Sequence, residues 1–126
     1  MTERFTFAFD WRFRLPLATL GIRPSTCEVV LTDQLFDARF GPFRLQTPRE
    51  NIRDVCITGP YTLIKAIGPR GSKVDHGATF GTNADRGVCV VFHEPVGALL
   101  GRDRFRHPGL TVTVGDPEGL ARSLRR

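Results

Sequence analysis

Few residues in this chain of 126 amino acids have the types and spacing that catalysis needs. A nucleophilic serine or cysteine requires a neighbouring base. None of the serines has the G-x-S-x-G setting of such a hydroxyl: Ser25, Ser72 and Ser123. The histidines are widely separated: His76, His93 and His107. We therefore expect a protein without catalytic activity and keep an enzyme of unknown class, with a pocket near His76 or His107, as an alternative.

The three cysteines do not form a recognisable metal or disulfide motif. Cys27, Cys56 and Cys89 stand singly inside apolar stretches and lack C-x-x-C spacing. An odd, scattered set of this kind is typical of buried, reduced thiols. We expect no metal site and no cofactor.

The segment between Tyr61 and Gly77 combines cations with apolar neighbours. Its GPRGSK stretch lacks the order G-x-x-x-x-G-K-[ST] of a phosphate-binding loop, and no helix pattern follows it. Basic loops beside apolar residues such as Ile64 and Ile67 are typical of contacts with membrane surfaces. The predicted ligand-binding residues of this segment are Tyr61, Lys65, Arg70 and Lys73.

A second candidate site lies on a predicted β-hairpin of residues 35–40 and 43–47, joined at Gly41-Pro42. A loop of two residues places Phe40 opposite Phe43 on one side of the hairpin. The same register places Arg39 opposite Arg44 on the other side, where like charges cost from a few tenths to about one kcal/mol. Because a bound anion would relieve this repulsion, Arg39 and Arg44 are also predicted ligand-binding residues.

The elements that carry these residues are mostly strands. Every odd position from Phe5 to Phe13 is aromatic, which predicts a strand with one buried face that bends or breaks near Asp10. Residues 15–24 are expected to form a connection with one helical turn, beginning near Pro16 and ending at Gly21. Further strands are expected at residues 26–31, 52–58, 78–82, 87–92 and 110–114.

Three details of this assignment concern the second half of the chain. Residues 61–77 are expected to form a long, partly ordered loop. Strands 78–82 and 87–92 are expected to form a hairpin, and the second of them, apolar at both parities, to be covered on both faces. Asp116 and Pro117 predict the start of a C-terminal helix that docks Leu120 and Leu124 on the sheet.

Seven or eight short strands followed by one helix predict a single, mainly β domain over residues 1–126. We expect a small antiparallel sandwich or a partly open barrel. The order of elements is similar to that of pleckstrin-homology-like domains. The segments FGPFRLQTP, TGPYTLIKAIGP, GATFGTN, RGVCVVF and RHPGLTVTV resemble those of a family of uncharacterised actinobacterial proteins of about this length. That resemblance covers roughly residues 5–124 and implies no activity.

The net charge of +5 comes from sixteen arginines and two lysines that alternate with acids along the chain. Because these cations are dispersed, nucleic acid is not an expected partner. The sequence lacks the roughly 20 consecutive apolar residues of a membrane span and a secretory signal, so we expect a cytoplasmic protein.

Together these features favour a non-catalytic binding or scaffold module that contacts an anionic membrane surface or a partner protein. A barrel that carries a small apolar ligand or haem among its phenylalanines is a second alternative, beside the enzyme. The sequence leaves the oligomeric state open.

Overall fold

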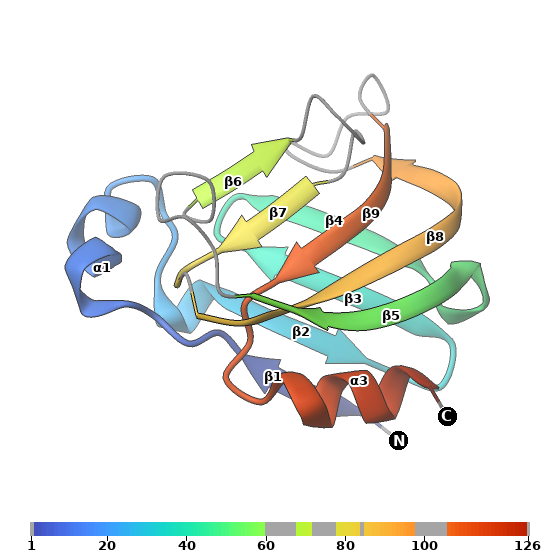
Figure 1. Cartoon of the computed structure of the whole chain (residues 1–126). Coiled ribbons are helices and arrows are strands. Elements are labelled where there is room, and N and C mark those ends of the chain that lie inside the picture. Colours follow the sequence, from blue (N-terminus) through green and yellow to red (C-terminus); the bar gives the residue numbers. More distant parts are fainter. Residues whose placement is uncertain (1, 60–67, 72–77, 84, 98–105, 126) are drawn as a thin grey trace.

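Two β-sheets form the body of the protein in the computed structural model, which describes residues 2–59, 68–71, 78–83, 85–97 and 106–125 (Figure 1). The first sheet has the order β1 (Glu3–Thr6), β2 (Cys27–Leu31), β3 (Leu35–Phe40) and β4 (Phe43–Pro48). The second has the order β5 (Ile52–Thr58), β8 (Gly87–Gly97), β9 (Arg106–Val112), β7 (Ala78–Gly81) and β6 (Gly68–Gly71). All described pairings are antiparallel except that of β7 with β9.

Two helices and two short 3₁₀ turns complete the described part of the chain. They are α1 (Trp11–Ala18), η1 (Pro24–Thr26), η2 (Arg49–Asn51) and α3 (Pro117–Arg125). The predicted fold class, a mainly β sandwich with a C-terminal helix, is confirmed. The strand beyond the eight expected from the sequence is β6, which lies inside the stretch expected to be a loop.

The core lies between the two sheets, where alternate side chains of each strand meet. Phe36, Phe40 and Leu45 of the first sheet are fully buried, as are Phe80 and Val90 of the second. The rings of Phe40 and Phe80 stack with their centroids 5.0 Å apart, which joins the two sheets directly. The predicted hairpin register is confirmed, with Phe40 opposite Phe43 and Arg39 opposite Arg44.

The helix α3 closes the side of the sandwich between β1 and β5 (Figure 1). Asp116 caps it as predicted, because its carboxylate accepts a hydrogen bond from the Gly119 amide at 3.0 Å. Ser123 Oγ donates to Glu3 of β1 at 2.9 Å, and Arg125 donates to the carbonyl of Val55 in β5 at 2.9 Å. The helix is therefore held to both sheets.

The strand predicted from Phe5 to Phe13 ends at Thr6, and the predicted break near Asp10 is present, but the residues after it form a helix instead of more strand. The Asp10 carboxylate accepts a hydrogen bond from the Arg12 amide and starts α1, which contains Pro16 rather than beginning there. The helix ends at Ala18, and the turn that follows it ends at Gly21, whose φ of +81° favours glycine. Because the period changes from two to 3.6 at Asp10, Trp11 is exposed instead of buried.

The segment between β1 and α1 crosses from the first sheet to the second. The Ala8 amide donates to the carbonyl of Thr113 at 3.1 Å, and the Asp10 amide donates to the carbonyl of Thr82 at 2.8 Å. Thr82 Oγ1 and Asn83 Nδ2 both donate to the Ala8 carbonyl, each at 2.6 Å. This crossing attaches the start of α1 to the ends of β7 and β9.

Strands β7 and β8 do not form the hairpin expected from the sequence. The strand β9 lies between them, antiparallel to β8 and parallel to β7. The expected cover on both faces of β8 is also only partly present. Val88 and Val90 are fully buried on the inner face, whereas Cys89 and Val91 on the outer face are half-buried.

The cysteines differ in exposure, contrary to the prediction that all three are buried. Cys27 is buried in the core, and this burial raises the pKa of its thiol. Cys56 of β5 is exposed and lies directly opposite the half-buried Cys89 of β8. None of the three forms a disulfide.

Candidate functional site

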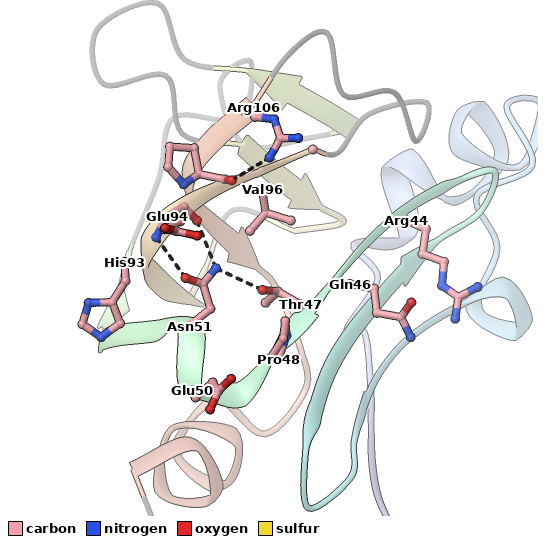
Figure 2. A pocket seen from close by; sticks show the side chains of 12 residues that line it. Arg44, Gln46, Thr47, Pro48, Glu50, Asn51, His93, Glu94, Val96 and Arg106 are labelled. Atoms are coloured by element: carbon pink, nitrogen blue, oxygen red, sulfur yellow. Dashed lines mark hydrogen bonds between the residues drawn. The ribbon is translucent and has the colours of Figure 1, made fainter.

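A groove of about 710 Å³ separates the edge strand β4 from the last residues of β8. Figure 2 shows Arg44 and Gln46 on the β4 side, and Asn51, His93, Glu94 and Arg106 on the other. The lining residues come from β4, η2, β8 and β9, so the groove runs along the open edge of the first sheet next to the second. Of the residues predicted to bind a ligand, Arg44 lies in this groove.

The backbone of β4 presents unpaired hydrogen-bonding groups to the groove. In an antiparallel pair, alternate residues direct their N–H and C=O groups toward the partner strand. The tight Phe40–Phe43 turn and the bond from the Arg49 amide to the Gln34 carbonyl at 2.8 Å fix that alternation. It directs the amides of Arg44 and Gln46 away from β3, and within the described residues neither has an acceptor.

The far wall of the groove is organised by the side chain of Asn51. Its Oδ1 accepts from the Glu94 amide at 2.9 Å, and its Nδ2 donates to the Glu94 carbonyl at 3.0 Å. The same Nδ2 is 3.0 Å from Thr47 Oγ1 on β4 (Figure 2). The Asn51 side chain thus pairs with β8 as the backbone of a strand residue would, and it links β8 to β4 on this side of the groove.

The charges that line the groove are balanced. Arg44 and Arg106 contribute two cations, and Glu50 and Glu94 contribute two anions. The Arg106 guanidinium also reaches the carbonyl of Pro95 at 3.5 Å. The groove therefore offers donors and acceptors of both kinds, with no excess of positive charge to attract a phosphate.

Arg39 and Arg44 already have an internal anion, because both guanidiniums bind the carboxylate of Asp37. Arg44 makes two hydrogen bonds to it, of 2.9 and 2.7 Å, and Arg39 makes one of 3.1 Å. Asp37 is only 4% exposed, although it lies on the outer face of the sheet. The two arginines lie opposite each other as predicted, but the anion between them is a carboxylate of the protein itself.

The pKa of Asp37 reflects two opposing effects. Burial raises it, and the hydrogen bonds and charges of Arg44 and Arg39 lower it further than burial raises it. The carboxyl pKa therefore lies below its ordinary value, and Asp37 remains ionised.

A second acid extends this network across the sheet. Glu28 on β2 accepts from Arg4 at 2.7 Å and lies 3.5 Å from Arg39. The outer face of the first sheet thus alternates Arg4, Glu28, Arg39, Asp37 and Arg44. Each guanidinium here has a carboxylate partner, so this face is no open anion site.

Of the other predicted ligand-binding residues, Arg39 lies opposite Arg44 on the outer face of the first sheet. Tyr61, Lys65 and Lys73 lie outside the described residues, and Arg70 lies on β6. Sequence reasoning did not single out Gln46 and Asn51. The period-two pattern of β4 could have identified Gln46 as an outward-facing residue of a strand. The pattern does not show that this strand lies at the edge of its sheet.

No cluster of three or more metal-ligating side chains occurs among the described residues. In that same part of the chain, no helix has the length and apolar character needed to cross a bilayer. Comparison with protein-family models, curated proteins and solved structures found no match. The resemblances to pleckstrin-homology-like domains and to an actinobacterial family therefore stay predictions.

Proposed function

We propose that the protein is a non-catalytic binding module that holds an extended segment of a partner protein in the groove along β4. The observation that supports this most directly is the pair of outward amides, Arg44 and Gln46, on an edge strand that borders a groove. Such an edge is a template on which another chain adds a strand. Main-chain hydrogen bonds then provide the affinity.

The dimensions of the groove fit a short segment. Residues 44–48 of β4 span about 17 Å at roughly 3.4 Å per residue, enough for four or five residues of an added strand. Alternate side chains of that strand point to opposite faces. Thr47 and Val96 border the groove on its two sides and would contact the inward-facing ones.

The charges favour a peptide over a lipid headgroup at this site. A phosphate needs converging donors whose charge is not already neutralised. In the groove, Arg44 is occupied by Asp37, and Glu50 and Glu94 lie close by. An uncharged backbone that carries both donors and acceptors matches this balanced lining better.

The two alternatives have less support. A carrier barrel needs an empty interior, but Phe40 and Phe80 stack between the sheets and occupy the space that a carried ligand would need. For an enzyme, His93 lines the groove, whereas His107 is buried on β9 and His76 lies outside the described residues. A cytoplasmic location stays a prediction.

The proposal is tested with a displayed library of random linear peptides, selected on the immobilised protein and measured by fluorescence anisotropy. Gln46→Pro removes one outward amide without breaking the β3–β4 ladder, and edge strands tolerate proline. We expect at least about a tenfold loss of peptide affinity, the equivalent of one lost main-chain hydrogen bond with its partner left unsatisfied. Gln46→Ala, which keeps the amide, is the matched control and should bind within about twofold.

Two outcomes would contradict the proposal. One is a library from which no peptide is enriched. The other is a selected peptide that binds Gln46→Pro as tightly as the unmodified protein. Circular dichroism of both variants establishes that the sheets are intact.

A further inference from the structure

The helix α1 and the turn after it expose an unusual amount of apolar surface. Of four exposed large hydrophobic side chains in the described residues, three lie here: Trp11 (83% exposed), Leu15 (78%) and Leu20 (56%). Trp11 and Leu15 are four residues apart and so share one face of the helix. Leu17, on another face, is buried in the core. The protein therefore covers one apolar side of α1 and leaves a second one open to solvent.

Positive charge borders this open side. A hollow of about 610 Å³ is lined by Trp11, Arg14, Leu15, Ala18, Arg23, Pro24 and Ser25. It contains two arginines and no acid. Within the described part of the chain, neither Arg14 nor Arg23 has a carboxylate partner.

Asp10, the acid nearest to Arg14 along the chain, is bound to another arginine. Both carboxylate oxygens of Asp10 are bound by the Arg12 side chain, at 3.1 and 2.7 Å. This pairing lowers the pKa of Asp10, so its charge stays with Arg12. The open side of α1 is thus both apolar and cationic.

We propose that this surface docks on an anionic lipid bilayer. Tryptophan is enriched at the interface between membrane and water, where its ring is apolar and its N–H is solvated. Arginine binds phosphate oxygens with several donors at once, and anionic leaflets attract cations held near their surface. Trp11 and Leu15 would enter the interfacial region while Arg14 and Arg23 contact headgroup phosphates.

The shape of this region favours a bilayer over an acidic peptide. The helix α1 lies beside the two sheets, so a broad, flat surface can reach it (Figure 1). Protruding side chains such as Trp11 and Leu15 insert into a bilayer without needing a matching pocket. This inference is independent of the groove along β4, which lies on other elements.

Trp11 supplies the measurement, because it is the only tryptophan of the chain. With vesicles of phosphatidylcholine and phosphatidylglycerol, we expect its emission to move to shorter wavelength and the protein to sediment with the vesicles. With phosphatidylcholine alone, both effects should be weak. Added salt should reverse binding to the mixed vesicles, since it screens the attraction.

Paired variants separate this surface from the overall charge. Arg14→Gln with Arg23→Gln should lower the partition constant by about 25-fold, or about fivefold per arginine near an anionic surface. Arg53→Gln with Arg122→Gln changes the net charge equally at exposed sites elsewhere and should have a much smaller effect. Leu15→Ser should also weaken binding, whereas Leu35→Ser, at the fourth exposed apolar residue, should not.

The proposal is overturned if the emission of Trp11 is unchanged by the mixed vesicles, or if the two arginine pairs reduce binding equally. It is also overturned if a polyglutamate peptide shifts the emission and the vesicles do not, which would assign the surface to an acidic protein partner. Circular dichroism and thermal unfolding of each variant exclude a loss of fold as the cause.

Discussion

The outer face of the first sheet and the open side of α1 are both rich in arginine, yet they differ in what surrounds it. On the sheet, Arg39 and Arg44 share the buried carboxylate of Asp37, and Glu28 adds a second acid. Beside α1, Arg14 and Arg23 have no acid among the described residues, and their neighbours Trp11 and Leu15 are exposed. The first arrangement stabilises the fold, and the second leaves charge and apolar surface available to a partner.

This difference shows why a net charge of +5 does not identify a binding surface. Arginines that are satisfied by internal acids contribute to that charge without attracting an external anion strongly. The informative property is the presence or absence of a carboxylate partner for each guanidinium. By that measure, the predicted anion site at Arg39 and Arg44 is structural.

The largest effect on this comparison is expected from Asp37→Asn, which leaves two guanidiniums facing each other over an uncharged amide. We expect a loss of about 2 kcal/mol in the free energy of unfolding, less than for a fully buried pair because both arginines are half-exposed. This corresponds to a midpoint about 8 °C lower in thermal unfolding. Glu50→Gln, which removes an exposed acid, is the control and should change stability by less than about 0.5 kcal/mol.

Lower pH should remove the same stabilisation. Because the pKa of Asp37 is lower in the folded protein than its ordinary value, its contribution is complete above about pH 4 and is lost as the pH falls through the folded pKa. Denaturant unfolding from pH 7 to pH 2 should show a constant difference between the unmodified protein and Asp37→Asn at neutral pH. Below about pH 4 this difference should shrink. A difference that is the same at all pH values would refute the structural role of this carboxylate.

The smallest expected changes in the free energy of unfolding come from replacing one arginine in each region. Arg44→Gln removes two hydrogen bonds to Asp37 but leaves Arg39 bound to it, so we expect a loss of about 1 kcal/mol. Arg23→Gln removes no ion pair and should change stability by less than about 0.5 kcal/mol. Equal losses, measured by urea unfolding at neutral pH, would mean that the two regions do not differ in this way.

The sequence predicts the β3–β4 hairpin well because its two strands and their turn are adjacent in the chain. The Gly41-Pro42 turn and the period-two pattern on both sides of it determine the register of β3 and β4. The role of Asp37 was also present in that pattern, since it precedes Arg39 by two residues and therefore shares its face. The prediction considered only residues directly opposite each other. Asp37 lies opposite Gln46 and is a diagonal neighbour of Arg44, so its role was not predicted.

The rest depends on contacts that are distant in the sequence. The insertion of β9 between β7 and β8 is a matter of topology, and local patterns do not determine it. At α1, the aromatic alternation continued past Asp10 and competed with an equally good helical spacing of Trp11 and Leu15. The capping hydrogen bond of Asp10 decides between the two. The groove is lined by residues of both sheets, so the pattern of a single strand does not predict it.

The crossing of residues 7–10 from one sheet to the other has a consequence for orientation. Hydrogen bonds from Ala8 and Asp10 to Thr113 and Thr82 hold one end of α1, and the packing of Leu17 holds the other. Because both ends are attached, the helix has little freedom to change its orientation relative to the two sheets. When α1 is docked on a bilayer, the β4 edge would therefore keep a fixed angle to the membrane plane. This angle determines the direction from which a second molecule can reach that edge.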